Sequence, residues 1–234
     1  MKENFIKLIA GVILISFVVT SCSQLNLAES NSSQPEMEFG KYSEFSESLK
    51  ANLSEILDSC KDGRQISTSN NLEYSDSEIE YLEDDSSGAE YLFTNGYISE
   101  RANAYIERIE NAFDTFEIEE DFLDEITAIE KEAMQMLSDT DLDSVMYYAE
   151  AVKTSISCFS DDTIQSRSIW KKIKKNIKKI AISTGLGAVV GAAVGFIATG
   201  SISTSLIFAG TSAIAGAINS YNSEKICIVF KPLV

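Results

Sequence analysis

The stretch that decides the fold runs from Ile180 to Tyr221 and reads IAISTGLGAVVGAAVGFIATGSISTSLIFAGTSAIAGAINSY. It contains no charged residue, and three of its seven glycines, Gly187, Gly191 and Gly195, follow one another at a spacing of four. Because an α-helix repeats about every 3.6 residues, this spacing places them in one row on one helix face. Glycine inside a helix costs roughly 1 kcal/mol relative to alanine, so the row favours close packing against a second helix.

The uncharged stretch is longer than the roughly 20 residues that one membrane span needs. The segment TGSIS at residues 199–203 interrupts it. We therefore predict a glycine-zipper helical hairpin over residues 181–221, with arms at 181–198 and 204–220. The second arm offers further small contacts at Ala209, Gly210, Ala213 and Gly216. Two interpretations remain open, a pair of transmembrane helices and a small-residue helix pair buried in a soluble bundle.

A basic amphipathic helix is predicted directly before the hairpin, over residues 161–180. Isoleucines at positions 169, 173, 177 and 180 share one face. The remaining positions carry six lysines, which are Lys171, Lys172, Lys174, Lys175, Lys178 and Lys179. Such a helix is typical of contact with an anionic membrane surface, where each lysine contributes about 1 kcal/mol. The alternative is pairing with the acidic part of this same chain, and nucleic acid is not expected as a partner of an exported protein.

The first 21 residues have the pattern of a secretory signal peptide, in which lysines precede an apolar run that ends at Val19. The run is followed by Thr20, Ser21 and Cys22, and this ending resembles the lipobox of bacterial lipoproteins. The resemblance implies cleavage before Cys22 and a diacylglycerol on its sulfur. An uncleaved anchor helix is the alternative. Residues 22–41 are rich in Ser, Asn, Gln and Glu and are predicted to form a disordered tether.

The middle of the chain, residues 42–160, is predicted to be an acidic helical domain because apolar residues recur there at helical spacing. A turn is expected at Asn95-Gly96, and residues 222–234 form a tail with a possible short strand at 225–230. The predicted fold class is mainly α, with an acidic helical bundle followed by the basic amphipathic helix and the small-residue hairpin. The helices of the bundle are expected at 42–60, within 74–90 with an end at Ser86-Ser87-Gly88, at 99–116, at 119–137 and, after a cap cluster at 138–141, up to about 158.

The formal net charge of −17 is distributed very unevenly. Of the 36 acidic residues, all except Glu3 and Glu224 lie within residues 23–166. Residues 167–179 hold only basic charges. The two regions must attract each other in the folded chain. After processing, the cysteines at 60, 158 and 227 would remain, which allows one disulfide and leaves one thiol.

The composition also excludes several classes of enzyme. The chain has no histidine, which removes Ser-His-Asp and Cys-His nucleophile systems and every zinc motif that contains histidine. Acidic pairs are so abundant that they do not indicate catalysis. We therefore expect no catalytic residue, no metal, no cofactor and no small-molecule substrate.

Cys22 at one end and the glycine row at the other give an arrangement that resembles bacterial envelope lipoproteins ending in a glycine-zipper hairpin. The resemblance implies a lipid-anchored cell-envelope protein, placed in the outer membrane where the cell has one. Its hairpin would associate with membrane lipid or with a second copy, in a structural or interaction role. The C-terminal region also resembles pore-forming bacteriocins in composition, so the alternative is a membrane-permeabilising toxin masked by its acidic domain. A tethered enzyme is the third hypothesis, and no constellation of residues favours it.

Overall fold

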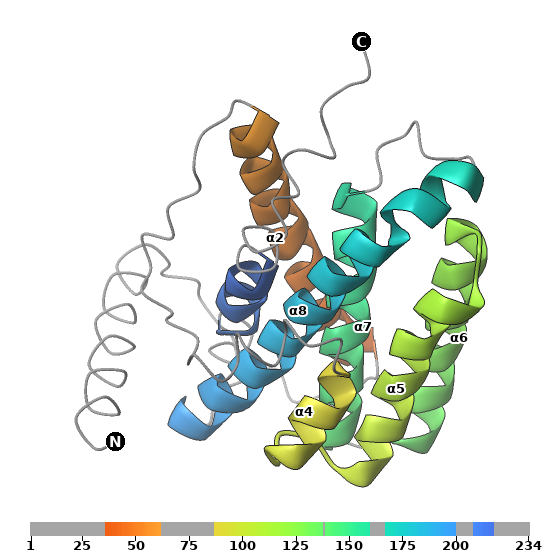
Figure 1. Ribbon diagram of the computed structural model, residues 1–234. Helices are drawn as coiled ribbons and strands as arrows, with labels where there is room; N and C mark the ends of the chain where they lie inside the picture. The colour runs from red at the N-terminus through yellow and green to blue at the C-terminus, as the bar shows by residue number, and fades with distance from the viewer. Residues whose placement is uncertain (1–35, 62–86, 138, 160–166, 200–207, 218–234) are drawn as a thin grey trace.

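The computed structural model describes residues 36–61, 87–137, 139–159, 167–199 and 208–217 (Figure 1). Within these ranges the chain forms seven helices and no strand, which confirms the mainly α fold class. The seventh helix, which we call the short arm, is Phe208–Ala217. The other six are α2 (Glu36–Lys61), α4 (Gly88–Thr94), α5 (Glu100–Thr115), α6 (Glu119–Met136), α7 (Asp139–Phe159) and α8 (Arg167–Thr199).

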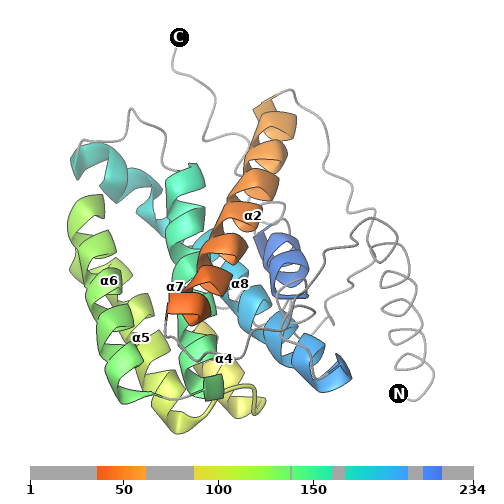
Figure 2. The same ribbon diagram turned by 180° about the vertical axis from the view of Figure 1, so that it is seen from behind.

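Helix α7 lies at the centre of the bundle. Views from opposite sides show α8 crossing one side of α7 and α2 crossing the other (Figures 1 and 2). The ring of Tyr147 contacts Tyr42 near the start of α2, while Cys158 lies against Lys50 further along it. Because both contacts advance together along the chain, α2 and α7 run in the same direction. Helices α5 and α6 pack beside α7, and α4 packs against α5 and α8.

The apolar faces expected from helical spacing form the core of the bundle. Ser99 begins α5 as an N-cap, because its side-chain oxygen accepts a hydrogen bond from the backbone N–H of Ala102. The predicted core residues that are buried are Phe45, Leu49, Leu53, Ala102, Ile106, Ile109, Ala112, Phe113, Phe122, Ile126, Ile129, Ala133, Leu137, Val145, Ala149, Val152 and Ile156. The turn at Asn95-Gly96 is confirmed as well, since Gly96 has a φ of 74° between α4 and α5.

Two predicted boundaries differ from the structure. Helix α2 begins at Glu36, so the last residues of the predicted tether are helical. Ser87-Gly88 was expected to end a helix, but it begins α4 instead. The physical reason is the hydroxyl of Ser87, which accepts from the backbone N–H of Glu90 as an N-cap.

The predicted basic helix and the first arm of the hairpin are one continuous helix, α8. Nothing between Lys179 and Ala181 breaks a helix, and Ile177, Ile180 and Ala181 are all buried. The expected end of this arm at residue 198 agrees with the end of α8 at Thr199. The predicted strand at 225–230, the remainder of the tail and the lipobox cysteine Cys22 lie outside the described residues.

Candidate functional site

The glycine row packs against the short arm at backbone distance. A Cβ atom placed on Gly187 would lie 2.1 Å from the backbone oxygen of Ser212. One placed on Gly191 would lie 2.3 Å from the backbone oxygen of Phe208. Real Cβ atoms essentially never approach other atoms this closely, so these two positions admit only glycine at the observed helix separation.

The short arm contributes a reciprocal glycine to this contact. A Cβ atom on Gly216 would lie 2.2 Å from the backbone oxygen of Ser183. Four residues forward on α8 therefore correspond to four residues backward on the short arm, which defines an antiparallel pair in a fixed register. Gly210 differs from the expectation, because no atom lies within 4 Å of a Cβ placed there. Gly195 is buried, as are Ala209 and Ala213.

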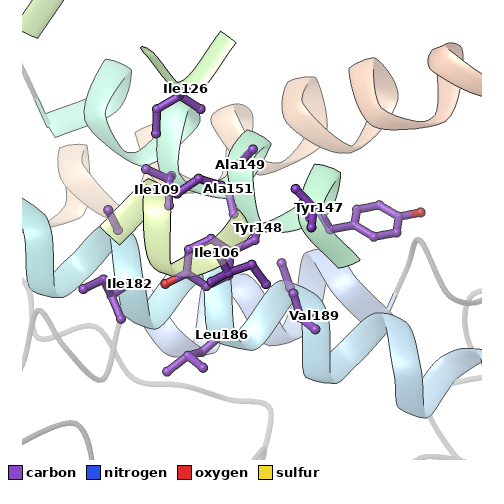
Figure 3. Close-up of a cluster of buried hydrophobic side chains, with 14 of the residues drawn as sticks. Ile106, Ile109, Ile126, Tyr147, Tyr148, Ala149, Ala151, Ile182, Leu186 and Val189 are labelled. Atoms are coloured by element: carbon purple, nitrogen blue, oxygen red, sulfur yellow. The ribbon is translucent and has the colours of Figure 1, made fainter. Parts of the chain in front are cut away.

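The other face of α8 packs against α7, as the close-up of the core shows (Figure 3). Ile182, Leu186 and Val189 of α8 are buried. A Cβ atom on Gly185 would lie 2.8 Å from the ring of Tyr148, so the absence of a side chain allows the ring to rest on the helix backbone. Helix α8 is thus enclosed by the short arm on one side and by α7 on the other.

A buried carboxyl group lies next to this contact. Glu110 of α5 is only 6% exposed, and three donors meet its two oxygens. The hydroxyl of Tyr148 donates to Oε1 at 2.6 Å and the backbone N–H of Ala89 donates to the same oxygen at 2.9 Å. The hydroxyl of Ser87 donates to Oε2 at 2.7 Å. Glu110 therefore joins α4, α5 and α7 at one point.

Burial is the dominant influence on the protonation of this group. It raises the pKa of Glu110, while the hydrogen bonds from Tyr148, Ser87 and Ala89 and the charge of Lys178 oppose that rise. The pKa of Tyr148 is also raised well above its ordinary value, first by burial and then by the neighbouring Glu110. The phenol consequently stays protonated and remains a hydrogen-bond donor.

The lysine segment of α8, residues 171–179, packs on the C-terminal end of α5. Lys174 donates to the backbone oxygen of Phe116 at 2.9 Å, where the helix dipole is negative. Lys178 pairs with Asp114 at 2.7 Å. Two of the six predicted membrane-contact lysines thus bind the acidic bundle, as the alternative interpretation of the basic helix expected.

The other four lysines divide into two groups. Lys175 is exposed and Lys179 is half-buried. Lys171 and Lys172 belong to α8, but their side chains lie outside the described part of the chain. Lys174 and Lys178 therefore bind the bundle, whereas Lys175 remains accessible to solvent.

A second buried acid connects α6 to α7. Glu130 is 4% exposed, and the ammonium group of Lys153 lies 2.7 Å from its Oε1. Lys153 also pairs with Glu150 at 2.8 Å. Burial raises the pKa of Glu130 against the opposing effect of Lys153. The two carboxylates raise the pKa of Lys153 although burial lowers it.

Neither buried acid was predicted, yet the sequence carries a signal for both. Glu110 follows the buried Ile106 by four residues and precedes the buried Phe113 by three, so it lies inside the apolar stripe of its helix. Glu130 has the same relation to Ile126 and Ala133. A charged residue at a core position of an amphipathic pattern is the feature that would have identified them.

Within the described ranges, no group of three or more His, Cys, Asp or Glu side chains is arranged to hold a metal ion. Cys158 is a free thiol whose pKa is raised by burial. The side chain of Cys60 and the whole of Cys227 lie outside the described part. Comparison with protein-family models, curated proteins and solved structures finds no match to this chain.

Proposed function

We propose that this chain is a lipid-anchored cell-envelope protein that stores an apolar helix pair inside an acidic bundle and associates with membrane through that pair. The role is structural or interactive rather than catalytic. The lipobox that ends at Cys22 supports the anchor and the envelope location. Membrane lipid is the proposed partner, since the packed helix pair is the least generic element of the chain.

The observation that carries the proposal is the composition and enclosure of α8. Its segment Ile177–Gly195 has 19 residues, a mean hydropathy of 1.5 and 67% of its residues buried. At 1.5 Å per residue, such a helix approaches the roughly 30 Å thickness of a bilayer core. A core helix of a soluble bundle has the same properties, so the membrane step needs its own test.

The lysine contacts provide a means of exchange between bundle and membrane. The Lys178–Asp114 pair is accessible to solvent, with side-chain exposures of 29% and 68%. Such a pair contributes at most about 1 kcal/mol and is weakened by salt. Anionic head groups offer the same lysines an alternative partner. Self-association through Gly187 and Gly191 would first require the short arm to leave α8.

The test is flotation of the protein with lipid vesicles, using residues 22–234 with Cys22→Ser so that no acyl chain contributes. Neutral and anionic vesicles are compared at low and high salt. We expect binding to anionic vesicles at low salt and weaker binding at high salt. Equal binding to both vesicle types at both salts would remove the electrostatic step. Absence of binding under every condition would leave the helix pair as a soluble core only.

A matched pair of variants tests the exchange itself. Asp114→Asn removes the partner of Lys178, whereas Glu132→Gln removes a negative charge that pairs with Arg108 instead. Both variants change the net charge by the same amount. We expect only Asp114→Asn to increase binding to anionic vesicles. An equal increase in both variants would show that net charge alone governs the binding.

The second candidate is a membrane-permeabilising protein, and the enclosure of an apolar helix pair by acidic helices favours it as well. The two functions differ in the effect of the bound protein on the vesicle. Dye release from the anionic vesicles by residues 22–234 would support permeabilisation. Binding without dye release would support the structural role.

A further inference from the structure

We propose that Glu110 and Tyr148 form a protonation-dependent latch, which holds α8 in the bundle most tightly when the carboxyl group is neutral. The inference deepens the proposed function by naming what regulates the release of the helix pair. Its geometric basis is the position of Tyr148, whose hydroxyl donates to Glu110 while its ring rests on Gly185. A shift of this one side chain alters both contacts at once.

The carboxyl group is nearly enclosed while the helices stay together, because Glu110 is only 6% exposed. A Cβ atom on Gly88 would lie 2.8 Å from Oε1 of Glu110 and 2.9 Å from the side chain of Ile182. The first turn of α4, the carboxyl group and α8 are thus in contact. Fuller hydration of an ionised Glu110 therefore requires at least one of these elements to move away.

The charges that surround Glu110 compensate it poorly. On α8 the nearby cation is Lys178, and this lysine is already paired with Asp114 of α5. On α7 the facing titratable group is the phenol of Tyr148, which stays protonated. On α4 the neighbouring Glu90 is exposed. Among the described residues, ionisation therefore places a charge in the interior that no dedicated cation neutralises, which is costly.

The neutral carboxyl group keeps its contacts. The hydroxyl of Ser87 can donate to a carboxylate or accept from a protonated carboxyl group, because it rotates about its C–O bond. Tyr148 and the backbone N–H of Ala89 continue to donate to Oε1. The two protonation states thus share one hydrogen-bond geometry and differ in the cost of burying the charge.

The direction of the pH effect is set by this cost. Burial raises the pKa of Glu110, so the closed state retains the proton to higher pH than an open state would. The hold on α8 is therefore complete below the ordinary carboxyl pKa. It weakens as pH rises from that value to the raised pKa of the closed state, and stays constant above it.

The test measures amide hydrogen exchange of residues 177–189 between pH 4 and pH 8, without lipid, on residues 22–234 with Cys22→Ser. Protection is corrected for the intrinsic pH dependence of exchange. We expect it to fall by about tenfold for each unit between the ordinary and the raised pKa. No membrane is present in this experiment. A negative result in hydrogen exchange would therefore refute the latch without affecting the vesicle experiment, and a negative result with vesicles would not affect the latch.

Two variants decide between a local latch and a general effect on stability. Glu110→Gln keeps an acceptor for Tyr148 and cannot ionise, so protection should become constant with pH. Glu130→Gln removes the other buried acid, which pairs with Lys153 of α7, and should leave the pH dependence of α8 intact. Loss of that dependence in both variants would overturn the latch. Persistence of it in Glu110→Gln would do so as well.

Tyr148→Phe provides a second readout should Glu110→Gln fail to fold. The ring can still rest on Gly185, but the carboxylate loses its shortest hydrogen bond. Since this bond stabilises the ionised form, its loss should move the fall in protection to higher pH. A pH profile identical to that of the parent protein would contradict the role of the hydroxyl.

Discussion

Replacing Gly187 by alanine tests whether the glycine row sets the separation of α8 and the short arm. The new Cβ atom would lie 2.1 Å from the backbone oxygen and 2.6 Å from the backbone carbon of Ser212. A backbone carbonyl cannot rotate away as a side chain can. The two helices would therefore have to separate by about 1 Å to restore ordinary van der Waals contact.

The expected magnitude combines two opposing effects. Alanine gains about 1 kcal/mol over glycine in helix propensity. Overpacking in a close-packed interior costs about 1–3 kcal/mol, and separation of the helices adds lost contacts along the pair. We expect Gly187→Ala to lower the free energy of unfolding by about 1–2 kcal/mol.

Gly210→Ala is the matched control, because it makes the same substitution in the partner helix of the same pair. No atom lies within 4 Å of a Cβ atom placed at Gly210. Only the propensity gain then remains, and the free energy of unfolding should rise by about 1 kcal/mol. Urea unfolding monitored by circular dichroism measures both variants. A Gly187→Ala protein as stable as Gly210→Ala would refute the packing role of the row.

Three further predictions concern other parts of the chain. Lys153→Met should lower the free energy of unfolding by about 2 kcal/mol at pH 8, because it leaves Glu130 buried without its cation. The loss in free energy of unfolding should be smaller at pH 5, because Glu130 of the variant can take up a proton in the folded state. An equal loss at both pH values would contradict the role of the Glu130 charge. Ser99→Ala should cost about 1 kcal/mol through the lost cap to Ala102, which corresponds to about 2–4 °C in a thermal melt; an unchanged melting temperature would argue against the cap. The mature protein should begin at Cys22 and carry a lipid there, so mass spectrometry that finds an intact signal segment would exclude the anchor.

The parts of the fold that the sequence predicted depend on local periodicity. Helices α5 and α6 agree with their expected ranges within a residue or two, because a clear apolar stripe and a cap such as Ser99 act over one or two turns. The predicted helix end at Ser87-Gly88 was wrong for an equally local reason. Serine before glycine can end one helix or cap the next, and here the hydroxyl of Ser87 accepts from the backbone N–H of Glu90 and caps α4.

The parts that could not be predicted depend on contacts between distant segments. The sequence predicted that the second arm packs on the glycine row, but not the register, in which Gly187 faces Ser212 and Gly191 faces Phe208. The sequence also left open whether the lysines face lipid or protein. That choice depends on the C-terminal end of α5, which lies 64 residues from Lys178 along the chain and becomes its neighbour only in the folded bundle.

The four-residue repeat of the antiparallel pair limits what the glycines can specify. A slide of one helical turn, about 5.4 Å, would bring Gly187 opposite Gly216 and Gly191 opposite Ser212. Neither pairing introduces a new Cβ atom on the α8 side, so the same small-residue faces would still meet. The glycines determine the distance between the two helices. The register of the pair must therefore be set by other side chains.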